Sequence, residues 1–216
     1  MLFVNFKTYE SATGEKAVEL AKICEKVSKE TGKEIVCVVQ AVDIYRVSQA
    51  VKLKVFAQHI DDVDYGSNTG FIMIDAVKQA GAVGTIINHS EHRIPLQKIK
   101  DAVEKCKHKM FPVLVCAQDP DEVEQMTRME PDWIAYEPPE LIGGDISVST
   151  AKPELITESV ERAALREKPL IVGAGVKNAI DVKVSIDLGA KGILVASGVT
   201  KSEDPEAALK DLVSNL

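Results

Sequence analysis

A titratable imidazole stands at the end of an apolar segment. Residues 83–88 read Val-Gly-Thr-Ile-Ile-Asn, and His89 follows them directly. Ser90 and Glu91 read as the start of a helix, whose N-terminus carries partial positive charge and free N–H groups. This position predicts a neutral imidazole that donates a hydrogen bond, which suits chemistry on a carbonyl group. The alternative is a capping segment with an incidental histidine.

A carboxylate follows a second apolar segment. Glu137 comes after residues 133–136, Trp-Ile-Ala-Tyr, and before a Pro-Pro step. Held there in a partly desolvated place, it could act as a general base. Gly143 and Gly144 come soon after the prolines. This order predicts a loop that is rigid at its start and can move as a lid over the site. The alternative is a solvated glutamate that opens an ordinary loop.

A cation and two glycine-containing turns could bind an anion. Lys7 follows the first apolar segment, where it is either a fixed positive charge beside a ligand or simply solvated. Residues 173–175 (Gly-Ala-Gly) and 196–198 (Ala-Ser-Gly) follow the last two apolar segments. Adjacent backbone N–H groups in such turns can hold a phosphate without arginine.

The elements that position these residues alternate along the whole chain. In eight segments both the odd and the even positions are apolar, which is typical of parallel strands covered on both faces. They are residues 2–6, 34–40, 54–58, 83–88, 111–116, 133–136, 169–173 and 192–196. Amphipathic stretches predict helices at 16–29, 96–107, 154–167, 179–188 and 205–216, and Gly32, Gly81 and Gly189 stand where helices should end.

This alternation predicts a compact α/β TIM (β/α)8 barrel, with residues 1–216 as a single domain. An open doubly wound sheet is the alternative, but no G-x-G-x-x-G motif follows the first strand. In a barrel the C-terminal ends of all strands meet at one rim. The residues expected there are Asn5, Lys7, His89, Glu137, Gly173, Gly175, Ala196 and Ser197.

Composition excludes several classes of partner. The net charge of −7 leaves no basic surface for nucleic acid or an anionic membrane. The four cysteines follow neither a zinc spacing nor a disulfide framework. No signal peptide or membrane-spanning segment is evident, so we expect a cytoplasmic protein.

Two groups of polar residues are not predicted to bind metal ions. Asp61, Asp62 and Asp64 lack the spacing of a calcium loop and read as solvated charges. The remaining histidines, His59, His92 and His108, form no metal-ligand pattern. We therefore expect no metal site.

Three motifs carry a family resemblance. Asn5-Phe6-Lys7, His89-Ser90-Glu91 and Ala135-Tyr136-Glu137-Pro138 stand in the order and spacing of the triosephosphate isomerase family. The resemblance covers the whole chain, and Pro138-Pro139-Glu140 with the compact length is similar to the archaeal branch.

The resemblance implies interconversion of dihydroxyacetone phosphate and glyceraldehyde 3-phosphate in glycolysis and gluconeogenesis, without a cofactor. Glu137 would move the proton, His89 would polarise the carbonyl and Lys7 would stabilise the oxyanion. The other implied site residues are Asn5 for substrate positioning, Ile142, Gly143, Gly173, Gly175, Ala196 and Ser197 for the phosphate, and Ser90 and Glu91 as supports of the catalytic groups.

The resemblance also implies self-association. The loop at 60–70 would insert into a neighbouring subunit, where Thr69 would brace Asn5 and Lys7 in a dimer or in a tetramer built from dimers.

Three departures from the commoner family pattern, at Glu140, Gly144-Asp145 and Gly173-Ala174-Gly175, affect lid contacts. The alternatives are another phosphate-binding barrel, such as a ribulose-phosphate epimerase or an indole-glycerol-phosphate-type lyase, and a barrel that binds a phosphometabolite without catalysis.

Overall fold

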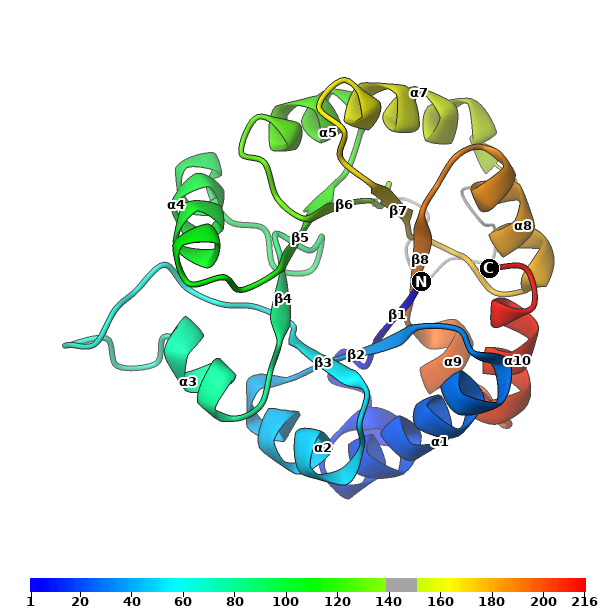
Figure 1. Ribbon diagram of the computed structural model, residues 1–216, viewed down its shortest axis with the longest axis horizontal. Coiled ribbons are helices and arrows are strands. Elements are labelled where there is room, and N and C mark those ends of the chain that lie inside the picture. The colour runs from blue at the N-terminus through cyan, green and yellow to red at the C-terminus, as the bar shows by residue number, and fades with distance from the viewer. Residues whose placement is uncertain (139–150) are drawn as a thin grey trace.

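Eight parallel strands close into a barrel. The computed structural model of the protein describes residues 1–138 and 151–216. The strands are β1 (Leu2–Asn5), β2 (Ile35–Val39), β3 (Lys54–Ala57), β4 (Gly84–Ile87), β5 (Val113–Ala117), β6 (Trp133–Tyr136), β7 (Leu170–Val172) and β8 (Gly192–Val195). Each strand pairs with the next, and β8 pairs with β1 (Figure 1). The predicted TIM (β/α)8 barrel is confirmed.

Helices form a ring outside the strands (Figure 1). They are α1 (Glu15–Thr31), α2 (Ile44–Ala50), α3 (Ile74–Gln79), α4 (Leu96–His108), α5 (Pro120–Thr127), α7 (Pro153–Ala164), α8 (Ala179–Asp187), α9 (Ser197–Thr200) and α10 (Pro205–Val213). Short 3-10 turns lie at Glu10–Ala12 and Ala41–Asp43. Within the described residues, none of these helices is both long and apolar enough to cross a membrane.

The helix ends follow the local sequence. α1 ends where Gly32 adopts a left-handed conformation, with φ of 68°, and donates its N–H to Ser28 O at 2.9 Å. Glycine takes this conformation without a Cβ penalty. The side chain of Asn178 accepts the N–H groups of Ile180 and Asp181 and so caps the start of α8.

Two apolar layers hold the barrel together. Side chains inside the barrel include Phe3, Phe56 and Leu114, and a larger cluster fills the space between strands and helices. Gly84 makes room for Phe56, because a Cβ at Gly84 would lie 2.3 Å from the ring. All four cysteines are free and buried, as the sequence suggested, and burial raises the pKa of Cys106 to about 12.

Candidate active site

The C-terminal ends of the strands enclose a small cavity of about 30 Å³. Asn5 ends β1, and Lys7, His89 and Glu137 follow β1, β4 and β6 within two residues. All four side chains line this cavity, together with residues that follow β7 and β8. The barrel therefore brings together residues that lie far apart in the sequence.

His89 is held by a turn and not by a helix. Its ring is buried, with 6% of the residue exposed. The backbone N–H of Glu91 donates to His89 Nδ1 at 3.1 Å, so that nitrogen is unprotonated and the ring proton of the neutral tautomer lies on Nε2. Nε2 is the nitrogen that faces Glu137, with Oε2 at 3.6 Å.

The prediction that Ser90 and Glu91 begin a helix is wrong. His92 N–H donates to His89 O at 2.8 Å in a tight turn, and α4 starts only at Leu96. Pro95 gives the physical reason, because the residue before a proline is disfavoured in the helical region. The turn still provides one backbone N–H group to His89, which is the contact that the helix was expected to make.

Asn88 shapes the exit from β4, a role that the sequence analysis missed. It is buried and has a left-handed φ of 60°. Its side chain donates to Cys116 O at 2.9 Å and accepts the N–H of Ile94 at 3.2 Å. Asparagine tolerates this conformation better than most residues, so its position just before His89 was the available signal.

Glu137 lies in a tight pocket with 5% of the residue exposed. Its side chain passes directly over Gly173, since a Cβ at Gly173 would lie 2.5 Å from Glu137 Cγ and 2.7 Å from Oε1. Oε2 has no hydrogen-bond partner among the described residues. A buried carboxylate oxygen without a partner is costly, which marks Oε2 as a candidate group for contact with a bound molecule.

Cys116 contacts Glu137 from inside the barrel. Burial raises the pKa of the Cys116 thiol well above its usual range, and the Glu137 carboxylate beside it adds to the shift. The thiol therefore stays protonated and can donate a weak hydrogen bond to the carboxylate.

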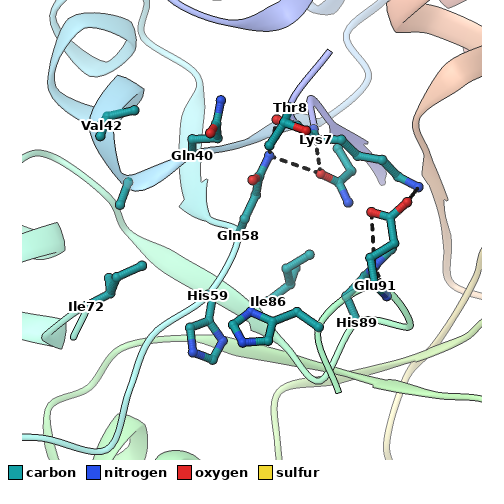
Figure 2. Close-up of a pocket in the computed structure, with 13 residues that line it drawn as sticks. Lys7, Thr8, Gln40, Val42, Gln58, His59, Ile72, Ile86, His89 and Glu91 are labelled. Atoms are coloured by element: carbon teal, nitrogen blue, oxygen red, sulfur yellow. Dashed lines mark hydrogen bonds and ion pairs between the residues drawn. The ribbon is translucent and has the colours of Figure 1, made fainter. Parts of the chain in front are cut away.

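Lys7 is fixed in place by three neighbours (Figure 2). Its backbone is left-handed, with φ of 48°, and its N–H donates to Asn5 Oδ1 at 3.0 Å. Gln58 Nε2 donates to Lys7 O at 3.0 Å and to Asn5 Oδ1 at 3.3 Å. Lys7 Nζ forms an ion pair with Glu91 Oε1 at 2.7 Å. Gln58 was missed because only the barrel places β3 beside this turn.

Glu91 connects the cation to the imidazole. Its Oε1 pairs with Lys7, its Oε2 lies 3.7 Å from His89 Nδ1, and its backbone N–H donates to the same nitrogen. Glu91 thus lies where the sequence analysis expected a support for the site. Ser90 lies in the turn between His89 and Glu91.

Two turns form the opposite wall of the cavity. Ala174 and Gly175 have φ of 68° and 74°, and Ala196 and Ser197 begin α9. The side chain of Lys177, which the sequence analysis did not consider, also lines this wall. A Cβ at Gly198 would lie 3.3 Å from Val176 O, so glycine lets the two turns approach closely. The first N–H groups of a helix have no partner within it and are available to an anion.

Some expected residues lie outside the described part of the chain. These are Ile142 and Gly143, expected to contact a phosphate, and the departures at Glu140 and Gly144-Asp145.

A larger cavity of about 350 Å³ opens beside the first, and its wall includes Lys7, Gln58, His59 and Glu91 (Figure 2). The His59 ring lies 4.3 Å from that of His92, and its Nε2 lies 3.3 Å from Asp61 Oδ1. Burial lowers the pKa of His59, and His92 lowers it further. Within the described residues, no group of three side chains could hold a metal ion.

A carboxylate and an imidazole that lie side by side in the wall of a cavity, with an ammonium beside them, define a barrel enzyme of the acid–base class. Comparison with known proteins identifies the family. The family described as Triosephosphate isomerase matches residues 1–215, and the chain belongs to this family and is an isomerase.

Archaeal relatives support this assignment. A triosephosphate isomerase of Methanosarcina acetivorans is 43% identical, over 98% of this chain and 96% of the relative. Those of Methanobacterium bryantii and Methanocaldococcus jannaschii are 44% and 40% identical, over 100% and 99% of this chain and 96% and 98% of the relatives. The resemblance found in the sequence motifs is confirmed.

Proposed function

We propose that this chain interconverts dihydroxyacetone phosphate and glyceraldehyde 3-phosphate through an enediolate, as a reaction of glycolysis and gluconeogenesis. The observation that carries the proposal is the buried, unpartnered Oε2 of Glu137, which faces His89 Nε2 at 3.6 Å among the described residues. At that separation the two groups lie side by side and can reach neighbouring atoms of one bound substrate. Family membership supports the same reaction.

Glu137 acts as the base in this proposal. Its carboxylate takes a proton from the carbon beside the carbonyl, the electron pair of that C–H bond forms the C=C bond of the enediolate, and the π electron pair of the carbonyl moves to its oxygen. The resulting carboxylic acid then returns the proton to the neighbouring carbon, which completes the isomerisation. General acid–base catalysis of this kind contributes about 10²- to 10⁴-fold to the rate.

His89 and Lys7 stabilise the charge that develops on oxygen. The Nε2–H of His89 donates to the carbonyl oxygen, and the same group passes the hydroxyl proton between the two oxygens of the enediolate. The Lys7 ammonium adds a positive charge in a site with little water, where electrostatic effects are strong. Asn5 holds the Lys7 backbone through a 3.0 Å hydrogen bond and lines the substrate cavity.

The phosphate would bind at the wall formed by Gly173, Gly175, Ala196 and Ser197. The left-handed turn and the start of α9 present backbone N–H groups there, and Lys177 adds a cation. Ile142 and Gly143 complete this set in the proposal. Every proton in the mechanism moves through a side chain of this protein, with no metal or organic cofactor.

A coupled assay tests the reaction, using protein free of host isomerase. We expect rapid conversion of glyceraldehyde 3-phosphate to dihydroxyacetone phosphate, competitively inhibited by phosphoglycolate, and no turnover of ribulose 5-phosphate. Phosphoglycolate binding without any isomerisation would instead favour the non-catalytic alternative.

We further propose that the chain self-associates. The segment between β3 and α3 projects from the barrel (Figure 1), and it carries the exposed residues Tyr65, Thr69 and Phe71. The 350 Å³ cavity beside Lys7 is a suitable socket for the same segment of a second copy. Exposed Val42 and Tyr45 near the socket add apolar surface, as expected of an interface.

Sedimentation velocity tests this self-association. We expect the wild type to sediment as a dimer or a tetramer, and Thr69→Arg to raise the dissociation constant at least about tenfold by placing a bulky cation near Lys7. Ser214→Arg, beyond the end of α10, is the matched control and should not affect association. A wild type that is monomeric at every concentration would contradict the proposal.

Two expectations complete the proposal. Residues 1–216 form one domain, which the closed barrel and the packing of α1 against α10 support. Location in the cytoplasm stays a prediction that fractionation of cells would test.

A further inference from the structure

The acidic run at the base of the projecting loop is engaged in ion pairs. The sequence analysis interpreted Asp61, Asp62 and Asp64 as solvated charges, but lysines of α4 contact two of them. Lys98 Nζ lies 3.1 Å from Asp62 Oδ1, and Lys105 Nζ lies 2.8 Å from Asp64 Oδ2. Asp64 is solvated as expected, since 67% of its side chain is exposed, but Asp62 is largely covered, and both ion pairs depend on the packing of α4 beside the loop, which spacing alone does not reveal.

Lys105 bridges two points of the loop. Its ammonium also donates to Asp62 O at 2.8 Å, so a single cation binds a backbone carbonyl and a carboxylate. The Lys105 side chain is 19% exposed, and that of Asp62 is 18% exposed. Their partners in the two ion pairs, Asp64 and Lys98, are 67% and 56% exposed, so each pair joins one covered group to one exposed group and is partly screened by salt.

Further contacts extend this support from the base of the loop to its tip. Asp61 Oδ2 accepts the N–H of Ile72 at 2.7 Å, and Asp61 N–H donates to Ile72 O at 2.8 Å, which closes the base. Asn68 Nδ2 donates to Asp64 O at 2.6 Å, which ties the tip, beside Thr69, to the residue that Lys105 binds. A continuous set of contacts therefore runs from α4 to the tip.

We propose that Lys105, assisted by Lys98, is a positioning residue that fixes the projecting loop in the shape in which it enters the socket of a second copy. This inference rests on the proposed self-association. A loop ordered before docking loses less conformational freedom on binding, so the brace lowers the cost of association. It acts on catalysis only indirectly, through the partner that the loop supports.

Sedimentation and hydrogen exchange test the proposal on the full chain. We expect Lys105→Met to raise the dissociation constant of the assembly about tenfold. Specific activity should fall on dilution and return at high protein concentration, with kcat of the assembled enzyme unchanged. Amide exchange across residues 62–70 should be faster in this variant when both proteins are monomeric.

The controls separate bracing from a general loss of charge. Lys100→Met removes an exposed lysine of α4 for which the described residues offer no ion pair, and it should leave association unchanged. Lys105→Arg keeps the cation and should stay within about threefold of the wild type. In a double-mutant cycle, Asp64→Asn should add little to Lys105→Met, because both break the same contact.

Three results would contradict the bracing role of Lys105, and each leads to a different conclusion. If the wild type associates and Lys105→Met associates equally well with unchanged loop exchange, the bracing role is overturned while self-association stands. If the wild type is monomeric but isomerises the substrate, self-association itself is overturned and the brace with it. If Lys100→Met weakens association as much as Lys105→Met, the effect is one of overall charge and the proposal is also overturned.

Discussion

Replacement of Glu137 by glutamine is expected to lower kcat about 10³- to 10⁴-fold with little change in KM. The amide keeps the size of the side chain, so its contact with Gly173 and the fold are retained, but it cannot accept the substrate proton. The loss corresponds to about 4 to 5.5 kcal/mol of transition-state stabilisation. The coupled assay gives kcat, and deuterium incorporation from D₂O into the product reports the proton transfer itself.

Two further variants set the scale for this result. Glu137→Asp withdraws the carboxylate by one methylene and should cost about 10²-fold in kcat, because small misplacements of a base are expensive. Glu104 is an exposed glutamate of α4, and Glu104→Gln is the matched control, which should leave kcat and KM unchanged. Turnover of Glu137→Gln within tenfold of the wild type would reject Glu137 as the base.

The barrel and the meeting of its functional residues could be predicted because both follow from local patterns. Strands such as β5, buried at every position, carry no polar alternation, which indicates a parallel strand covered on both sides. Eight of these with helices between them imply closure. Closure then requires that His89 and Glu137 meet at one rim.

The contacts across strands could not be predicted in the same way. Gln58 reaches the Lys7 turn because the ends of β1 and β3 lie at the same rim with β2 between them, and Cys116 reaches Glu137 because β5 pairs with β6. Neither pair of residues shares a sequence motif. The ion pairs of Asp62 and Asp64 depend likewise on the packing of α4. The helix wrongly expected at Ser90 differs in kind, because Pro95, which precedes the start of α4 at Leu96, is a signal in the sequence itself.

Glu91 links Lys7 to His89 through both its side chain and its backbone. The Glu91 carboxylate binds the Lys7 ammonium at 2.7 Å, and the Glu91 backbone N–H donates to His89 Nδ1 at 3.1 Å, so one residue contacts both groups. In the proposed reaction, a developing oxyanion would share Lys7 with Glu91, whose side chain is 56% exposed. Glu91 therefore orients the cation and leaves its charge available.

Gly173→Ala should be the most damaging substitution outside the groups that take part in proton transfer. A Cβ at this position would lie 2.5 Å from Glu137 Cγ and 2.7 Å from Oε1, distances that force the Glu137 side chain to move. Because Gly173 leads directly from β7, its backbone is fixed and the carboxylate must give way. A shift of about 1 Å in a catalytic group can cost about 10²-fold, so we expect kcat to fall by that factor.

A comparison with Glu137→Gln tests whether Gly173 acts through the carboxylate. If it does, the double variant should be no slower than Glu137→Gln alone, because a displaced amide has no catalysis left to lose. The midpoint of thermal unfolding should change little even though kcat falls, because rotation of the Glu137 side chain toward the cavity relieves the strain. Fully additive losses, or wild-type turnover by Gly173→Ala, would mean that the glycine does not position Glu137.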